Sequence, residues 1–173
     1  MIDINARLEN GCLINGDVIL AGDLVRQPTE AIVNPANVDL LHGGGAARAI
    51  ASAAGPELED ECRHYIRQHG PLKVAQPVHT TAGNLPLPIV CVIHMPGPDL
   101  RDYHDKDECY QLLKQAFRNC FKHANNVVNV HSLAVPAISS GKHRLPVLYI
   151  LLVIVAPPKY IEIQCQCLSA WRC

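Results

Sequence analysis

The chain has few aromatic residues and almost no net charge. Phe, Trp and Tyr make up 5% of the sequence, and the formal net charge is -1 at pH 7. A near-neutral chain has no overall basic field that would attract nucleic acid or an anionic membrane, so both classes of partner are disfavoured. Any site for an anion must therefore be built locally, from backbone groups and a few side chains.

Long apolar runs and patterned cysteines are also lacking. The strongest apolar run, 145–156, is shorter than the roughly 20 residues that a membrane-spanning helix needs. The eight cysteines include no C-x-x-C pair, so we expect reduced thiols and an intracellular protein, cytoplasmic or nuclear. Cys165 and Cys167 lie close together, but no recognised four-ligand zinc spacing accompanies them, and we expect no metal and no cofactor.

Apolar residues are abundant, and their patterns alternate between strand and helix. At 173 residues and 49% apolar content, the chain fits one domain over 1–173 with a sizeable core. Strands alternating with helices predict an α/β fold whose central sheet is mostly parallel and covered on both faces. We expect strands at 18–21, 31–33, 74–81, 89–95 and 127–135, and helices at 46–54, 56–69 and 107–124.

Three polar loops each follow a predicted strand. They contain Asp23, the segment 34–45 and the segment 139–141. In sheets of this kind ligands bind beyond the carboxyl ends of the strands, so we expect the three loops to converge on one cleft. The glycines Gly43–Gly45 open a helix, where bare backbone N–H groups and the positive end of the helix dipole favour an anion such as a diphosphate.

The polar side chains of these loops suit the rest of a nucleotide sugar. The amides of Asn34 and Asn37 can bond sugar hydroxyls without adding charge, and the Asp23 carboxylate can accept from an exocyclic amine such as that of adenine. Each feature alone has a structural alternative, which is an Asx-turn for the asparagines, a tight turn for the glycines and an exposed turn for Asp23. Their combination at strand ends favours a binding site.

These residues resemble the macro domain family. The resemblance covers residues 16–142, after an N-terminal extension at 1–15 and before a divergent tail at 143–173. It implies a three-layer α/β/α sandwich with a central mixed, mostly parallel sheet. The motifs that carry it, in family order, are GD at 22–23, IVNPAN at 32–37, HGGGAARAI at 42–50, VIHMPGP at 92–98 and PAISSG at 136–141.

The resemblance implies that the ligand is ADP-ribose, free or attached to proteins. Asp23 would hold the adenine amine beside the Leu24 backbone, and Asn34 and Asn37 would face the distal ribose, with Asn37 as the candidate catalytic residue. His42 would border the same ribose, the alternative being a solvent-exposed loop histidine. The two implied phosphate loops consist of Gly43, Gly44, Gly45, Ala46 and Ala47, and of Ser139, Ser140, Gly141 and Lys142, with His143 in place of an aromatic residue over the ribose.

Three functions stay open at this point. The first is ADP-ribose binding with metal-free hydrolysis of mono-ADP-ribose from acidic side chains. The second is a non-catalytic reader of ADP-ribosylated proteins, because Ala47 stands where one hydrolytic branch has an aspartate. The third is a degenerate domain, because Arg144 replaces a loop glycine and the C-terminal elements are atypical. The apolar tail lacks the polar face of an amphipathic helix, which favours a partner that covers it.

Overall fold

The computed structural model describes residues 11–14, 17–20, 23–139 and 162–166. The predictions for Ser140, Gly141, Lys142, His143 and Arg144, and for most of the apolar tail, lie outside these residues. In the described part, no helix is both long enough and apolar enough to cross a membrane.

In the part of the chain that the structure describes, a seven-stranded sheet forms the centre, with strand order β1-β2-β7-β6-β3-β5-β4. The five strands β2, β7, β6, β3 and β5 run parallel, and β1 and β4 pair antiparallel at the two edges. The predicted mixed, mostly parallel sheet is confirmed. The strands are β1 (Gly11–Ile14), β2 (Asp17–Leu20), β3 (Ala31–Ala36), β4 (Val78–Thr81), β5 (Cys91–Pro96), β6 (Ser132–Pro136) and β7 (Glu162–Gln166).

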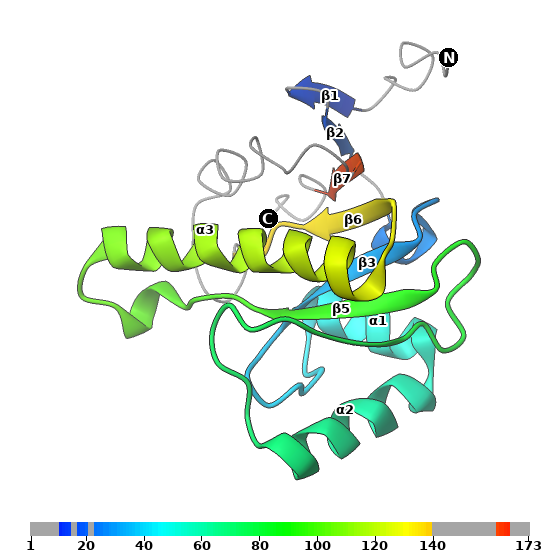
Figure 1. The fold of residues 1–173 in the computed structure, drawn as a ribbon, viewed down its shortest axis with the longest axis horizontal. Helices are drawn as coiled ribbons and strands as arrows, with labels where there is room; N and C mark the ends of the chain where they lie inside the picture. The colour runs from blue at the N-terminus through cyan, green and yellow to red at the C-terminus, as the bar shows by residue number, and fades with distance from the viewer. Residues whose placement is uncertain (1–10, 15–16, 21–22, 140–161, 167–173) are drawn as a thin grey trace.

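Helices cover both faces of this sheet, which confirms the three-layer sandwich. Figure 1 shows α3 (Lys106–His123) on one face, and α1 (Gly45–Ala54) and α2 (Pro56–His69) on the other. Short helical turns add η2 (Leu24–Arg26), η3 (Leu100–Asp102) and η4 (Ala124–Val128).

The alternation of side chains along the inner strands divides the core into two clusters. Ala31 and Val33 of β3 pack in the cluster that contains Phe117 of α3, whereas Ile32 packs in the cluster of α1 and α2. Successive residues of a strand point to opposite faces, so even-numbered residues of β3 lie toward α1 and α2. This alternation determines on which face of the sheet each polar side chain of β3 lies.

The predicted helices are confirmed to within a residue at most ends, because their signals are local. Gly55 and Gly70 follow α1 and α2 with φ of +83° and +75°, and Pro56 occupies the first turn of α2. The Asp105 carboxylate caps α3 by accepting from the N–H of Asp107 at 2.8 Å. Glycine adopts positive φ without a Cβ penalty, which explains both helix ends.

Three predicted strands begin too early and one ends too early. The segment 89–95 forms a strand only from Cys91, and the strand predicted at 31–33 continues to Ala36. The segment 74–81 forms a strand only from Val78, because Ala75 has a φ of +64° and its N–H donates to Pro96 in a loop contact. The segment 127–135 forms a strand only from Ser132, because η4 prolongs the end of α3 until Asn129, which is left-handed. Neither turn has a Gly or Pro at the position that adopts positive φ.

The C-terminal segment contributes a strand to the sheet. β7 lies between β2 and β6 and pairs in parallel with both. The tail that we expected to be atypical therefore supplies an inner strand that joins β2 to the rest of the sheet.

Candidate functional site

The structure brings the predicted loops to one edge of the sheet. β2, β3, β5 and β6 are parallel members of one sheet, so their carboxyl ends meet at the same edge (Figure 1). The loops that carry Asp23, Asn37, the glycine triplet and Ser139 all leave from these ends. In a sheet of this kind the edge beyond the carboxyl ends is where ligands bind.

The glycine triplet presents open backbone at the start of α1. Gly43, Gly44 and Gly45 are exposed, and a Cβ added at any of them would meet nothing within 4 Å. Gly44 provides no side-chain cap, and no acidic residue lies in the first turn of α1. The first turn of the helix, with its orphan N–H groups and positive dipole end, thus starts from exposed glycines and has no side-chain cap at Gly44, as an anion site requires. The φ of Gly45 is +56°, a backbone conformation that favours glycine.

Asn37 holds the loop that leads to these glycines. Its Oδ1 accepts from the N–H of Leu41 at 2.8 Å, and its Nδ2 donates to the Leu41 carbonyl at 3.1 Å. The residue is exposed. A side-chain amide has two donors and two acceptor lone pairs, so one of each remains for a ligand. Asn37 therefore serves the local turn and keeps hydrogen-bonding capacity toward the cleft.

Asp23 and Leu24 lie at the start of η2. The Asp23 carboxylate accepts from the N–H of Val25 at 3.2 Å and lies 3.5 Å from Arg26 Nε, with 55% of its side chain exposed. Leu24 is buried in the core cluster of α1 and α2. Asp23 is thus a helix cap with an exposed carboxylate, and its predicted contact with an adenine amine stays a prediction.

Asn34 is fully buried, unlike Asn37. Its Nδ2 donates to Nδ1 of His94 at 2.9 Å, and its Oδ1 is buried without a hydrogen-bond partner. Asn34 and His94 are directly paired in register between β3 and β5, on the face toward α1 and α2. The predicted contact of Asn34 with a sugar stays a prediction, and in the structure the amide positions an imidazole.

A buried cluster of polar side chains surrounds His94, and the sequence analysis missed it. Nε2 of His94 donates to Thr80 Oγ1 at 3.0 Å and lies 3.7 Å from Cys62 Sγ. The ring of His42 tilts against that of His94 with 5.8 Å between centroids, and Nε2 of His42 is buried without a partner. The one available signal was a single histidine inside the apolar run of β5.

Burial sets the protonation states in this cluster. Desolvation lowers the pKa of His94 to about 3, with the charges of His42 and His79 acting in the same direction. Desolvation also lowers the pKa of His42 and raises the pKa of Cys62 to about 12. His42 is half-buried and its Nε2 is fully buried, so it is not a fully exposed loop histidine. Its predicted contact with the distal ribose stays a prediction.

Ser139 belongs to the second predicted phosphate loop, of which only this residue is described. It is buried, its Oγ has no hydrogen-bond partner, and its φ is +64°. A Cβ added at Gly97, just after β5, would lie 2.3 Å from this Oγ. Gly97 is therefore needed for the close approach of the chain segments that follow β5 and β6.

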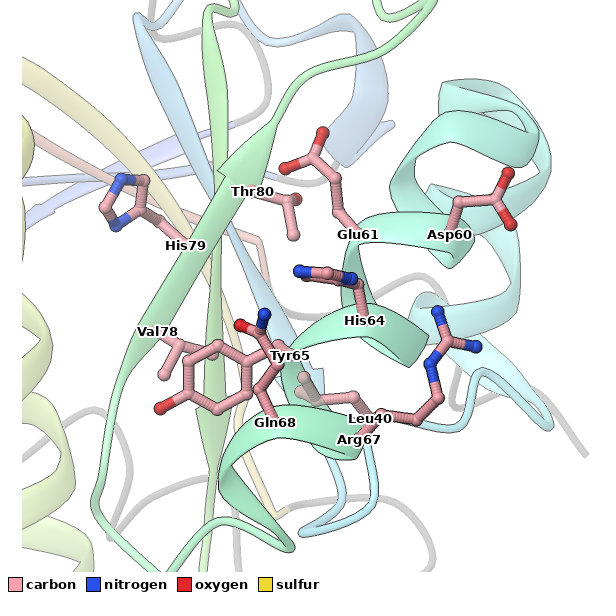
Figure 2. A pocket seen from close by; sticks show the side chains of 10 residues that line it. All are labelled: Leu40, Asp60, Glu61, His64, Tyr65, Arg67, Gln68, Val78, His79 and Thr80. Carbon is pink, nitrogen blue, oxygen red and sulfur yellow. The ribbon is translucent and has the colours of Figure 1, made fainter.

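A cavity of about 490 Å³ lies elsewhere, between α2 and the edge strand β4. Figure 2 shows Tyr65, Gln68, Val78 and Thr80 among its lining side chains. None of the residues predicted to contact ADP-ribose lines it. The cavity is thus separate from the candidate site at the glycine triplet.

Known proteins resemble this chain in sequence and in fold. The macro domain profile matches residues 33–150. An O-acetyl-ADP-ribose deacetylase of Escherichia fergusonii is 43% identical over 129 residues, covering 74% of this chain and 70% of that protein. Human protein mono-ADP-ribosyltransferase PARP14 is 37% identical over 129 residues, covering 75% of this chain and 7% of that protein.

Solved structures also resemble this chain in fold. The Oceanobacillus iheyensis macrodomain, as a glycine-to-valine mutant with ADPR, has a TM-score of 0.77 at 26% identity, covering 92% of this chain and 90% of that one. The same macrodomain with ADP has a TM-score of 0.75 at 27% identity, covering 91% and 87%. The agreement of sequence profile, sequence relatives, fold and glycine-loop geometry leads to one conclusion: the chain belongs to the macro domain family.

Proposed function

We propose that the protein binds ADP-ribose, free or attached to proteins, beyond the carboxyl edge of its parallel strands. The carrying observation is the exposed glycine triplet at the N-terminus of α1, with open space at each glycine and no local side-chain cap. The solved relative named with ADPR and the relatives named O-acetyl-ADP-ribose deacetylases support this ligand.

Three parts of the ligand, namely the diphosphate, the adenine and the distal ribose, have counterparts in the described residues. The N–H groups that open α1 bind the diphosphate, because the helix dipole and the unpaired donors act together there. The free lone pairs of the Asp23 carboxylate accept from the adenine amine. The remaining donor and acceptor of Asn37 bond the hydroxyls of the distal ribose, while its other pair keeps the turn to Leu41.

We further propose hydrolysis of mono-ADP-ribose from acidic side chains. Water attacks C1″ of the distal ribose, the bond from C1″ to the carboxylate oxygen breaks, and the products are ADP-ribose and the free acid. Asn37 orients the ribose and the water, and the bound diphosphate fixes C1″ against them, so positioning and electrostatics supply the acceleration. This chemistry uses no metal.

A non-catalytic reader is the second candidate function. Ala47 is buried in the first turns of α1 and has no group that could position water. If Asn37 does not act on water, the same cleft would recruit the protein to ADP-ribosylated targets without turnover.

Titration calorimetry with ADP-ribose tests the binding proposal. Asp23→Ala should weaken affinity by roughly 10- to 160-fold, because a hydrogen bond to a charged group contributes about 1.5–3 kcal/mol. Asn125→Ala is the matched control, since Asn125 is exposed and precedes β6 at the opposite edge of the sheet. Absence of binding heat with folded wild-type protein would refute the proposal.

Release of label from a protein mono-ADP-ribosylated on glutamate separates the two candidate functions. Asn37→Asp keeps an oxygen that accepts from the Leu41 N–H, whereas Asn37→Ala loses the turn contacts as well. If Asn37 acts in turnover, both variants lose activity. If Asn37 only supports the loop, Asn37→Asp retains most of the activity. If wild-type protein binds ADP-ribose without releasing label, it is a reader.

A further inference from the structure

Three potential metal ligands converge in the buried cluster behind the glycine triplet. They are His42 from the loop before α1, Cys62 from α2 and His94 from β5, and one ligand atom of each lies within 4.8 Å of the others. Cys62 and His94 are buried and His42 is half-buried. Among the residues that the structure describes, no other group of this kind is present.

The distances are close to those of a tetrahedral zinc site. Zinc bonds of about 2.3 Å to sulfur and about 2.0–2.1 Å to nitrogen place tetrahedral S and N ligands roughly 3.6 Å apart. Cys62 Sγ and His94 Nε2 are 3.7 Å apart, so this pair already has the required spacing. His42 alone has to move inward, by about 1 Å at the 4.8 Å limit.

A buried polar atom without a partner supports the same conclusion. It is Nε2 of His42. Buried polar groups in native proteins almost always have a partner, and each exception asks for an explanation. A metal ion gives Nε2 of His42 a partner directly. For His94 to bind the metal through Nε2, the Asn34 amide has to present its oxygen to Nδ1, and Nε2 has to give up its 3.0 Å hydrogen bond to Thr80 Oγ1.

Asn34 matches the second shell of a histidine metal site. A ligating histidine usually bonds through its other ring nitrogen to a neighbouring group that fixes its orientation. The Asn34 amide lies 2.9 Å from Nδ1 of His94 and is fixed by its place in β3. On α2, the negative charge of Glu59 acts on both His42 and Cys62 and offsets part of the positive charge of a bound ion.

We propose that His42, Cys62 and His94 bind one zinc ion, which ties the loop before the glycine triplet to α2 and β5. Two imidazoles and one thiolate are ligands that Zn²⁺ accepts, and the fourth position takes water. Binding converts the Cys62 thiol to the thiolate and releases its proton to solvent. With one position open to water, the site is not a closed four-ligand site, and its proposed role is to anchor the loop to the core. It stands independently of the proposed function because ADP-ribose is not among its ligands.

Titration of metal-free, reduced protein with Co²⁺ tests the site without ADP-ribose. We expect one equivalent to bind, with a thiolate-to-cobalt charge-transfer band and the visible bands of a tetrahedral complex, and Zn²⁺ to displace it. Cys62→Ala and His42→Ala should abolish the charge-transfer band or weaken binding by more than the roughly 10- to 100-fold typical of outer-shell residues. Asn34→Ala should weaken binding within that range.

Three variants are controls for competing sites. Cys91→Ala removes a buried thiol outside the cluster, His79→Ala breaks the surface pair in which His79 and His123 lie 2.9 Å apart, and Cys165→Ala removes one of the two closely spaced C-terminal cysteines. All three should bind Co²⁺ like wild type. Circular dichroism verifies folding, and if Cys62→Ala fails to fold, His42→Ala in the half-buried loop decides.

The outcomes that overturn the proposal are specific. They are absence of a thiolate band in folded wild type, a thiolate band in Cys62→Ala, wild-type affinity for Co²⁺ in His42→Ala, and a band lost in a control variant but kept in both cluster variants. Each would mean that the cluster is a hydrogen-bonded core network only, or that the metal binds elsewhere.

Discussion

The contact between Gly97 and Ser139 should couple the ends of β5 and β6. A methyl group at Gly97 would lie 2.3 Å from Ser139 Oγ and 2.6 Å from Cγ2 of Ile138. Real Cβ atoms do not approach so closely, so Gly97→Ala must shift the side chains of Ser139 and Ile138 or the segment that carries them toward the second predicted phosphate loop. Overpacking of this kind costs about 1–3 kcal/mol of unfolding free energy.

A double-mutant cycle isolates the contact. Ser139→Gly removes the Oγ and relieves the φ of +64°, but it also makes the unfolded chain more flexible, so the single variant should change stability by less than about 1 kcal/mol. In the double variant only the Ile138 contact remains. We expect Gly97→Ala to cost less there, with a coupling energy of about 1 kcal/mol or more.

Urea denaturation of the four proteins measures the cycle. Gly43→Ala is the matched control, because an added Cβ there meets nothing within 4 Å and the residue is exposed; its stability should stay within about 0.5 kcal/mol of wild type. The reasoning is refuted if Gly97→Ala is as stable as this control. It is equally refuted if the two changes add within about 0.5 kcal/mol.

Two further predictions concern titrating groups. Burial and then the charge of His79 lower the pKa of His123, so His79→Gln should raise it in an NMR titration, and an unchanged value would contradict the role of His79. His123 is harder to protonate in the folded than in the unfolded protein. It therefore reduces the stability of the fold as pH falls below its ordinary pKa of 6.5. The pKa of Glu30 is lowered, mainly by the hydrogen bond from the backbone N–H of His131. The Glu30 carboxylate therefore stabilises the fold above its ordinary pKa of 4.5, and this stabilisation is lost as pH falls through the pKa of the folded protein. Glu30→Gln should therefore cost at most about 1 kcal/mol in urea denaturation at pH 7, since the pair is partly exposed, and a loss that persists under strongly acidic conditions would contradict the assignment.

Local chemistry made the helices and the glycine loop readable from the sequence. Gly55, Pro56 and Gly70 mark the ends of α1 and α2 through backbone preferences that do not depend on distant residues. The strand ends that carry the predicted loops follow from apolar runs stopped by polar residues. The early starts assigned to β4 and β6 show the limit, because the turns at Ala75 and Asn129 have hydrogen bonds to Pro96 and Ala124 that a strand pattern does not reveal.

The different fates of Asn34 and Asn37 show what pattern alone cannot decide. Both follow the same apolar run and both suit a sugar, yet Asn34 lies within β3 and is buried against His94, whereas Asn37 is exposed after the strand ends. Strand parity and the extent of β3 make the difference. Ending the strand at Val33 instead of Ala36 is enough to make a core residue look like a ligand contact.

By itself, the sequence determined the α/β class, the helix ends and the glycine-rich loop that opens α1, because these depend on backbone preferences within a few neighbouring residues. Only the tertiary structure decided which strands are neighbours, that Gly97 must lack a side chain beside Ser139, and that His42, Cys62 and His94 meet. Such contacts join residues far apart in the chain, 32 positions in the case of Cys62 and His94. Sheet pairing and helix packing create them, and no local pattern encodes either.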